Sequence, residues 1–442
     1  MKSEAPLNSK DRFQLGRFLF IYCYRILFFP IFLILLPHYL LRMWRRGGYA
    51  RGFWHRFGFC PRSKKSNTWW IQAVSVGEVE ALEPLLSRLK GLNISVYLTT
   101  TTSTGFKIAQ AKYSQCVDNI AYFPLDFFLF SKLAWHRIHP SVVLLMESEL
   151  WPEHLYQAVK HYTPVHLING RCSDKSFAHY RKCLPIARLL LGNLTRIFAI
   201  SSLDAERFRE LCPQQVAIQT LGNLKIDAAL NKLKIKDGLK RSDLGQDWEK
   251  AMILIGASTW PGEEAFLLRF FQKARLNCPH LRLILVPRHV ERTEEIRVLL
   301  RDSPYKCCFH TSPQQDTDIY VVNTTGELAK FISISDFVFV GKSLPPNQGG
   351  QTPLEAAAQG KAIVYGPHMQ NFHVLCSSLE TEGGSYRCQN ETEVEACLNR
   401  WLEDIESAKT MGMKARLWCQ KHSGITNRLI TLLSQELKQI RF

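Results

Sequence analysis

Residues 69–80 read WWIQAVSVGEVE: an apolar run, a polar turn and the start of a helix-like stretch. An apolar run without alternation is typical of a parallel strand that is covered on both faces. Similar runs recur as far as residue 225, each separated from the next by a helix-like segment, which predicts a doubly wound α/β domain over roughly residues 50–225. The strands predicted there are Trp69–Ser75, Ser95–Thr100, Asn119–Phe123, Val142–Glu147, Val165–Asn169, Ile197–Ser201 and Ala217–Leu221.

A second α/β domain is predicted behind a polar, charged stretch at residues 225–250, which is typical of a linker with a short helix. Amphipathic stretches around residues 391–406 and 426–440 predict two closing helices. Two such domains joined by one linker imply a cleft, and ligands of these sheets bind at the carboxyl ends of the strands. The strands predicted for this domain are Met252–Ala257, Leu281–Val286, Ile319–Val322, Phe337–Val340 and Ala362–Tyr365.

Basic residues are concentrated at the front of the chain. The 442 residues carry 56 Lys and Arg against 39 Asp and Glu, a formal net charge of +17. Residues 1–65 alone hold 13 Lys or Arg and two acids, and no acidic residue occurs between Asp11 and Glu78. Because the rest of the chain is only weakly basic, this distribution argues against a nucleic-acid partner.

The most apolar run of the chain, Ile26–Leu36, lies inside this basic segment. With its apolar flanks it reaches the roughly 20 residues that cross a bilayer core of ~30 Å. Arg25, Pro30, Pro37 and His38 interrupt it, so a helix lying in the membrane interface stays open as an alternative. No small-residue cleavage site follows, which predicts a single uncleaved anchor. The basic residues behind the run predict that the remainder faces the cytoplasm, next to anionic lipids.

The 13 Cys residues are scattered and form no C-x-x-C pair. A disulfide framework or a zinc site needs recurrent close spacing. Free thiols are the ordinary state in a reducing cytoplasm. The sequence therefore predicts no disulfide scaffold, no metal site and no cofactor.

Glu78 is the strongest candidate for a reacting group in the first domain. It follows the quoted strand and a turn that contains Ser75 and Gly77, where Gly77 predicts a sharp bend. One positioned carboxylate can act as a general base on a hydroxyl group. The alternative is a carboxylate that only favours the N-terminus of the next helix.

Two further strand ends of this domain are polar. Glu147 and Glu149 follow the apolar run VVLLM, where they either act in a site or brace a neighbouring cation. Thr99–Thr104, which includes Thr102, predicts hydroxyl donors to a phosphate or sugar, or else a plain polar turn.

The second domain has strand ends that suit an anion. A glycine loop over Gly341–Gly350 leads into an Ala-rich helix, and free backbone N–H groups at a helix start attract anions. The pattern is neither a P-loop nor G-x-G-x-x-G. Other candidates at strand ends are Ser258, Thr259 and Glu263, then Pro287, Arg288 and His289, and after the glycines Thr352 and Glu355.

In this order, the segments resemble the Kdo transferases, which move 3-deoxy-D-manno-oct-2-ulosonic acid (Kdo) from CMP-Kdo to lipid A precursors. The matching segments span nearly the whole chain. They are the basic apolar front, AVSVGE (73–78), TTTTSTG (99–105), MESELWP (146–152), NGR (169–171), GNLKID (222–227), GASTWPGEE (256–264), VPRH (286–289), TTGEL (324–328), VGKSL to PLEAAAQG (340–360) and YGPHMQNF (365–372).

The resemblance implies an α/β fold of the GT-B type, with two Rossmann-like domains facing a cleft and an N-terminal membrane-anchoring helix. The implied bounds are an anchor at 1–47, an acceptor domain at 48–228, a CMP-sugar donor domain at 229–425, and a C-terminal helix at 426–442 packing back on the N-terminal domain. Members act at the cytoplasmic face of the inner membrane, in contact with anionic lipids.

The implied activity is an inverting, metal-independent transfer of Kdo to the lipid A precursor lipid IVA, and to Kdo already attached, in lipopolysaccharide core biosynthesis. Glu78 is then the base, Arg288 a phosphate partner and Glu355 a ligand of the cytidine or ribose. The acceptor residues are Ser75, Gly77, Thr102, Glu147, Glu149, Arg171 and Lys225. The donor residues are Ser258, Thr259, Glu263, Pro287, Arg288, His289, Gly326, Glu327, Gly349, Gly350, Thr352 and Glu355.

Two positions depart from the family pattern. Thr352 replaces an amide side chain that helps hold the nucleotide, and Asn323 replaces an Asp. Two other functions therefore stay open: a GT-B transferase that uses another nucleotide sugar, and a catalytically inactive relative that binds lipid or nucleotide.

Overall fold

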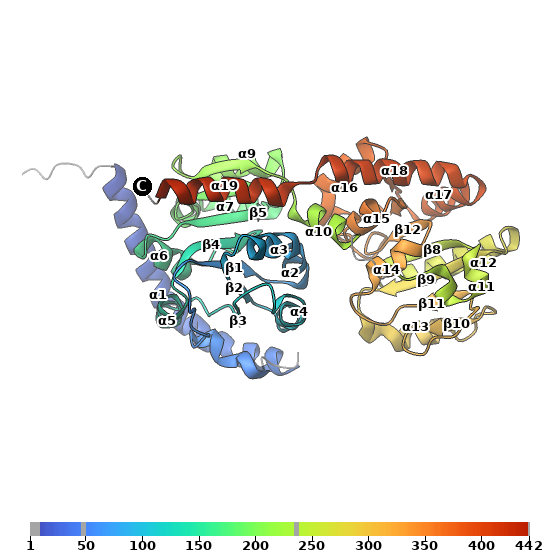
Figure 1. Ribbon diagram of the computed structural model, residues 1–442, viewed down its shortest axis with the longest axis horizontal. Helices are drawn as coiled ribbons and strands as arrows, with labels where there is room; N and C mark the ends of the chain where they lie inside the picture. Colours follow the sequence, from blue (N-terminus) through green and yellow to red (C-terminus); the bar gives the residue numbers. More distant parts are fainter. Residues whose placement is uncertain (1–8, 46–49, 234–237, 441–442) are drawn as a thin grey trace, which may run out of the picture. The chain divides into compact units, whose positions relative to one another are not determined.

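The computed structural model describes residues 9–45, 50–233 and 238–440, and the chain forms two compact units (Figure 1). Unit 1 is Met1–Ala228 together with Gly424–Phe442, and unit 2 is Ala229–Ser423. Residues 1–8 and 46–47 of the predicted anchor lie outside the described residues. Each unit contains one seven-stranded parallel sheet, so the predicted fold class of two Rossmann-like domains is confirmed.

The sheet of unit 1 has the strand order β3-β2-β1-β4-β5-β6-β7. The order reverses between β1 and β4, and ligands of open α/β sheets bind at the carboxyl ends of strands next to such a switch point. The segments that follow β1 and β4 are therefore the expected ligand-binding segments of unit 1. The strands are β1 (Thr68–Ala73), β2 (Ser95–Thr100), β3 (Asn119–Tyr122), β4 (Pro140–Met146), β5 (Val165–Gly170), β6 (Arg196–Ala199) and β7 (Ala217–Thr220).

Helices cover both faces of this sheet, and in Figure 1 the C-terminal helix α19 (Ile425–Ile440) crosses the unit beside α3. The helix α10 (Leu224–Lys232) starts in unit 1 and ends in unit 2. The other helices of unit 1 are η1 (Ala50–Phe57), α2 (Val76–Ala81), α3 (Glu83–Gly91), α4 (Ser103–Tyr113), α5 (Phe128–Ile138), α6 (Pro152–Lys160), α7 (Asp174–Lys182), α8 (Leu184–Leu191) and α9 (Ser202–Leu211).

The first helix, α1 (Ser9–Arg45), is continuous through Pro30 and Pro37. Within it, Gln14–His38 is long and apolar enough to cross a membrane by length and composition. The helix contacts α6 and α8 and lies along one side of unit 1 (Figure 1).

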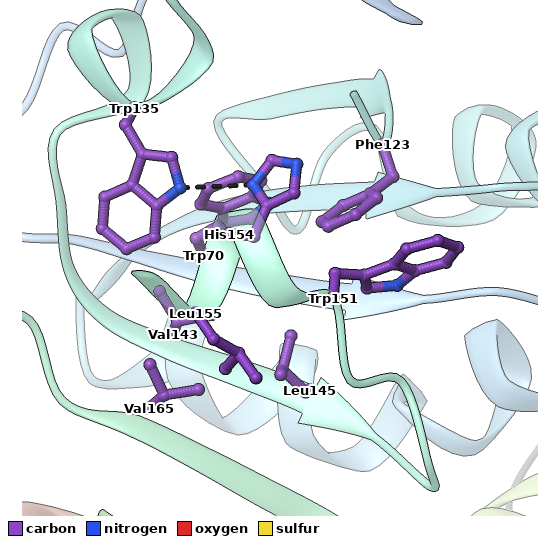
Figure 2. A pocket seen from close by; sticks show the side chains of 9 residues that line it. All are labelled: Trp70, Phe123, Trp135, Val143, Leu145, Trp151, His154, Leu155 and Val165. Carbon is purple, nitrogen blue, oxygen red and sulfur yellow. Dashed lines mark hydrogen bonds between the residues drawn. The ribbon is translucent and has the colours of Figure 1, made fainter. Parts of the chain in front are cut away.

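Aromatic side chains fill the core of unit 1 between the sheet and α5–α6. Figure 2 shows a small apolar cavity in this core, where Trp135 Nε1 donates a hydrogen bond to His154 Nδ1 at 3.2 Å. Burial lowers the pKa of His154 to about 3, so its ring is neutral and able to accept that bond. This cavity belongs to the packing of the fold, and its lining consists of Trp70, Phe123, Trp135, Val143, Leu145, Trp151, His154, Leu155 and Val165.

The sheet of unit 2 has the order β10-β11-β9-β8-β12-β13-β14. Its switch point lies between β8 and β12, so the segments that follow these two strands are the expected ligand-binding segments of unit 2. The strands are β8 (Met252–Thr259), β9 (Leu281–Pro287), β10 (Cys307–Phe309), β11 (Ile319–Val321), β12 (Phe337–Val340), β13 (Ala362–Tyr365) and β14 (Tyr386–Arg387).

The core of unit 2 forms where the apolar faces of α12 and α17 pack against its sheet, with Phe337 stacked on Trp401. The helices are η2 (Arg241–Leu244), α11 (Gln246–Glu249), α12 (Glu263–Asn277), η3 (Val290–Arg292), α13 (Thr293–Leu300), α14 (Leu328–Ile334), α15 (Leu354–Ala358), η4 (Gln370–Phe372), α16 (His373–Thr381), α17 (Glu391–Glu403) and α18 (Ile405–Lys421).

Candidate active site

Glu78 lies in the first turn of α2, directly after β1 and beside the switch point of unit 1. Its Oε2 accepts a hydrogen bond from Val74 N and its Oε1 accepts one from the Ser75 hydroxyl, both at 2.8 Å. Ser75 in turn caps the helix by accepting from Glu78 N. The carboxylate therefore stabilises the N-terminus of α2, which was the alternative to a role as a base. The same hydrogen bonds also hold it in one orientation.

Burial raises the pKa of Glu78 above its ordinary value, and the nearby Glu147 raises it further. The Val74 amide, the Ser75 hydroxyl and the Lys225 ammonium act in the opposite direction. A carboxylate whose pKa is raised is a stronger base once it is ionised.

Two more carboxylates lie at the end of β4. Glu147 has a left-handed backbone with φ 57°, a conformation that is costly for a residue with a side chain and is concentrated at functional sites. Its Oε1 accepts from Lys225 Nζ at 2.6 Å. Glu149 accepts from Trp151 Nε1 at 2.9 Å, and burial together with Glu78 raises the pKa of Glu149 to about 7. The predicted acidic residues of unit 1 thus form one cluster of three carboxylates and one ammonium.

Replacement of Lys225 by Gln is expected to move the acid limb of the pH–rate profile to higher pH. Without the ammonium, ionised Glu78 loses an attractive charge, so the pKa of Glu78 rises and the base is protonated at pH values where the wild type is active. The rate at alkaline pH is expected to change least. The profile is measured from initial rates, with Lys112→Gln as the control, because Lys112 pairs with Glu80 on the same helix as Glu78. A limb shifted toward lower pH would contradict this account.

Two other predicted residues of unit 1, Gly77 and Thr102, have local structural roles. Gly77 was expected to form a sharp bend, and this is wrong: it is the second residue of α2 and its φ is not positive. A Cβ at Gly77 would meet no atom within 4 Å, so the side of the helix next to Glu78 is open. Thr102 caps α4 by accepting from Gly105 N, and its hydroxyl donates to Val74 O at 3.0 Å.

Arg171 follows β5, and its backbone N donates to Glu147 O at 3.2 Å. In the described part of the chain, the half-buried Arg171 guanidinium has no acidic partner. Lys225, which like Arg171 is a predicted acceptor residue, is paired with Glu147. Arg171 is therefore the better placed of the two for an incoming anion.

In unit 2, Glu263 holds the segments that follow β8 and β12. It is almost completely buried. Its Oε2 accepts from Trp260 N and Lys342 N at 2.9 and 2.8 Å, and its Oε1 accepts from Ser343 N and Leu344 N at 2.8 and 3.2 Å. Because both oxygens are engaged by backbone amides, the carboxylate positions this loop and has no lone pair directed at a ligand.

The end of β8 has unsatisfied polar atoms. Ser258 has a left-handed backbone with φ 56°, and Thr259 is fully buried. Among the described residues, Thr259 Oγ1, Trp260 Nε1 and Thr324 Oγ1 are shielded from solvent and have no hydrogen-bond partner. Unsatisfied buried polar atoms are costly, and a bound ligand is one way to satisfy them.

Two positions of the glycine loop have a backbone conformation and surroundings that favour glycine. Gly349 has φ 102°, and a Cβ there would lie 2.5 Å from Asn371 Nδ2. Gly350 has φ 71°, and its N donates to Lys342 O at 2.9 Å. The loop is thus closed on itself at the end of β12.

The remaining predicted donor residues also follow the carboxyl ends of strands in the unit 2 sheet. Arg288 and His289 are exposed directly after Pro287, the last residue of β9. Gly326 has φ 91° in the segment after β11, and Glu327 pairs with Lys330. The Thr352 hydroxyl accepts from Leu354 N at 3.3 Å, a short cap at the start of α15. Glu355 already has a partner, because its Oε1 accepts a hydrogen bond from Lys232 Nζ at 2.5 Å.

Several residues near the strand ends of the two sheets were not predicted from the sequence. The Asn169 Oδ1 accepts from Leu224 N at 2.9 Å, and its φ of 54° is the conformation that an Asn-Gly pair at a strand end could have indicated. Lys232, which pairs with Glu355, carries no local pattern that would single it out. Lys342 lies in the glycine loop with its ammonium 4.4 Å from the centre of the Trp260 ring.

The fold is shared with solved structures, among them a UDP complex and a glycotransferase. The UDP complex of MnaA from S. aureus has a TM-score of 0.57 at 12% identity, covering 84% of this chain and 97% of that one. The glycotransferase of kitacinnamycin has a TM-score of 0.54 at 12% identity, covering 84% and 99%. These likenesses establish the GT-B type of fold.

Sequence comparison gives the family. The model of the 3-deoxy-D-manno-octulosonic-acid transferases (kdotransferase) matches residues 51–228. Proteins named 3-deoxy-D-manno-octulosonic acid transferase from Haemophilus influenzae and Bordetella pertussis are each 28% identical, covering 88% and 91% of this chain and 92% and 97% of the relatives. The one from Rickettsia typhi is 30% identical over 79% of this chain and 74% of its own length. The chain is therefore a glycosyltransferase that belongs to the 3-deoxy-D-manno-octulosonic acid transferase family.

Proposed function

We propose that this protein transfers Kdo from CMP-Kdo to the lipid A precursor lipid IVA, and to Kdo already attached, in lipopolysaccharide biosynthesis. The family supports the transfer of Kdo, since relatives that match most of the chain carry that name. The observation that carries the proposal is Glu78, a buried carboxylate that two hydrogen bonds orient beside the switch point of unit 1.

Glu78 acts in this proposal as the general base. It removes the proton from an acceptor hydroxyl while the hydroxyl oxygen attacks the anomeric carbon of the donor. Attack from the side opposite the leaving CMP inverts the configuration at that carbon. The raised pKa of Glu78 favours this role, because it brings the base closer to the pH at which it works. Arg171 is assigned to the anionic groups of the acceptor.

Unit 2 is assigned to the donor. Negative charge grows on the CMP phosphate as its bond to the anomeric carbon breaks. Arg288, which is exposed directly after β9, is the group that we assign to that charge. Fixed positive groups of this kind stabilise a leaving phosphate directly, so we expect transfer to proceed without added metal.

A GT-B transferase that uses a uridine nucleotide is the second candidate, because a fold neighbour is a UDP complex. Calorimetric titration separates the two. We expect CMP to bind at least tenfold more tightly than UDP or UMP. Preference for a uridine nucleotide would move the protein to the second candidate, and no binding of any of them would favour a lipid-binding relative without activity.

We also propose that α1 lies in the plane of the inner membrane, at its cytoplasmic face. Two side chains within the apolar segment of α1, Arg25 and Tyr24, bond to buried acidic residues of the sheet domain in unit 1. Arg25 makes a two-bond ion pair with the fully buried Glu153, at 2.8 and 2.9 Å. The Tyr24 hydroxyl donates to Asp126 Oδ2 at 2.8 Å. A spanning orientation would break these contacts or draw charged groups of unit 1 into hydrocarbon.

The opposite side of α1 suits lipid. Ile26 and Ile34 are 71% and 76% exposed, and the apolar residues Leu129 of α5 and Ile186 of α8 are also exposed. A helix with one docked face and one exposed apolar face is typical of an interfacial anchor. An N-terminal epitope tag in inside-out inner-membrane vesicles tests this orientation. Because the cytoplasmic face of these vesicles is exposed, we expect protease to digest both the tag and the two units. A tag that is protected while the units are digested would indicate a spanning helix.

Arg25→Gln is expected to destabilise unit 1 by about 3 kcal/mol, because it leaves the Glu153 charge buried without its partner. Chemical denaturation of the protein in detergent measures this loss. Arg181→Gln is the matched control, because the Arg181–Glu210 pair is largely exposed and contributes at most about 1 kcal/mol. Equal stability of the two variants would mean that the Arg25 pair does not hold α1 in place.

A further inference from the structure

Lys342 has a backbone conformation that its side chain does not favour. It follows β12 and Gly341, with φ 59°. A left-handed conformation costs free energy for any residue with a Cβ and is retained where the surrounding structure enforces it. Strain of this kind points to a role for the side chain, because glycine would meet the same backbone geometry without cost.

The surrounding loop enforces this geometry from both sides. Lys342 N donates to Glu263 Oε2 at 2.8 Å, and Lys342 O accepts from Gly350 N at 2.9 Å. The same Glu263 oxygen accepts from Trp260 N at 2.9 Å. One buried carboxylate therefore fixes the backbone of both Lys342 and Trp260.

The side chain of Lys342 has a weak partner. Its ammonium lies 4.4 Å from the centre of the Trp260 ring, and the His289 ring meets the same indole edge-on at 5.1 Å between centres. Among the residues that the structure describes, no acidic side chain pairs with Lys342. A cation–π contact is weaker than a charge-assisted hydrogen bond to an anionic oxygen, so an anion at this edge would attract the ammonium away from the ring.

We propose that Lys342 binds the phosphate of the nucleotide donor, moving to it from the Trp260 ring. This inference rests on the proposed function and adds a binding residue to its donor site. Lys342 follows β12 and Trp260 follows β8, the two strands at the switch point of unit 2. Arg288 follows the neighbouring β9, so two cations on nearby strand ends are available for one phosphate.

The charge change in the transfer gives this cation a function. The acceptor oxygen forms a bond to the anomeric carbon, and its proton goes to Glu78. The bond from that carbon to the phosphate oxygen breaks, and CMP leaves with the electron pair as a phosphate monoester with one more negative charge. An ammonium close to this oxygen stabilises the charge as it develops.

Lys342→Gly tests the inference without the risk of misfolding, since glycine accepts a φ of 59° freely. We expect its melting temperature to equal or exceed that of the wild type. In calorimetric titrations of the full-length protein, we expect its affinity for CMP to fall about tenfold or more, the loss that accompanies one charge-assisted hydrogen bond. Affinity for cytidine, which has no phosphate, is expected to change less than about twofold on the same reasoning. Lys342→Arg is expected to restore part of the CMP affinity.

Lys273→Gln is the matched control, because Lys273 is an exposed lysine of unit 2 that pairs with Glu395. We expect it to leave CMP affinity unchanged. Unchanged CMP affinity in Lys342→Gly, or equal losses for CMP and cytidine, would overturn the inference. Loss of binding of free Kdo with CMP binding intact would also overturn it, because the ammonium would then serve the sugar carboxylate. Failure of the wild type to bind CMP would instead contradict the proposed donor.

Discussion

Glu78→Gln is expected to lower the transfer rate by about a thousandfold, within the range that a positioned general base contributes. The amide has nearly the same shape as the carboxylate and can still accept from Val74 N, so we expect α2 to form. It cannot take up a proton from the acceptor hydroxyl. Rates are measured as product mass against time at saturating substrates, and CMP affinity is expected to stay the same because the donor is assigned to unit 2.

Glu80→Gln is the control for this substitution, since Glu80 lies on the same helix and pairs with Lys112 at 2.7 Å. We expect it to retain close to full activity. A folded Glu78→Gln protein with wild-type activity would reduce Glu78 to the helix-start role that its hydrogen bonds also support.

Glu263→Ala is expected to have the largest effect on stability, about 4 kcal/mol or more. It removes the acceptor of four backbone N–H groups, and each buried donor left without a partner costs about 1–3 kcal/mol. For a unit of this size the loss corresponds to a fall of roughly 10 °C in melting temperature. We expect CMP binding to be lost with the loop geometry.

Calorimetry of the full chain measures this effect. Glu406→Ala is the matched control, because Glu406 is an exposed residue of unit 2 whose partner is Lys409. A melting temperature of Glu263→Ala close to that of Glu406→Ala would show that the loop after β12 does not depend on the buried carboxylate. Glu263→Gln is expected to fall between the two, because its amide can accept from some of the N–H groups but not all.

The sequence predicted the strands of both sheets well because they are continuous apolar runs with buried faces. Ser95–Thr100, Phe337–Val340 and Ala362–Tyr365 were predicted with the bounds that the structure has. The short edge strands β10 and β14 were missed, since two or three residues carry no periodicity. The helix α18 was also missed between the two predicted closing helices.

The candidate site was predicted in part, for a different physical reason at each residue. Glu78 could be predicted because a strand, a turn and an acidic first helical turn are close together in the sequence. The pair Lys232–Glu355 joins residues 123 positions apart, and no local pattern indicates such a contact. The four amides around Glu263 come from the separate segments after β8 and β12, so its positioning role could not be seen before the fold was known.

The mass of the product shows whether this protein transfers Kdo to lipid IVA without a metal. The full-length protein is incubated with lipid IVA and CMP-Kdo generated in situ, in the presence of EDTA and without added metal. We predict that the acceptor gains one or more whole Kdo units, and the number of additions gives the number transferred. An unchanged acceptor, from a protein that binds CMP in the same buffer, would contradict the assignment of this chain as a metal-independent Kdo transferase.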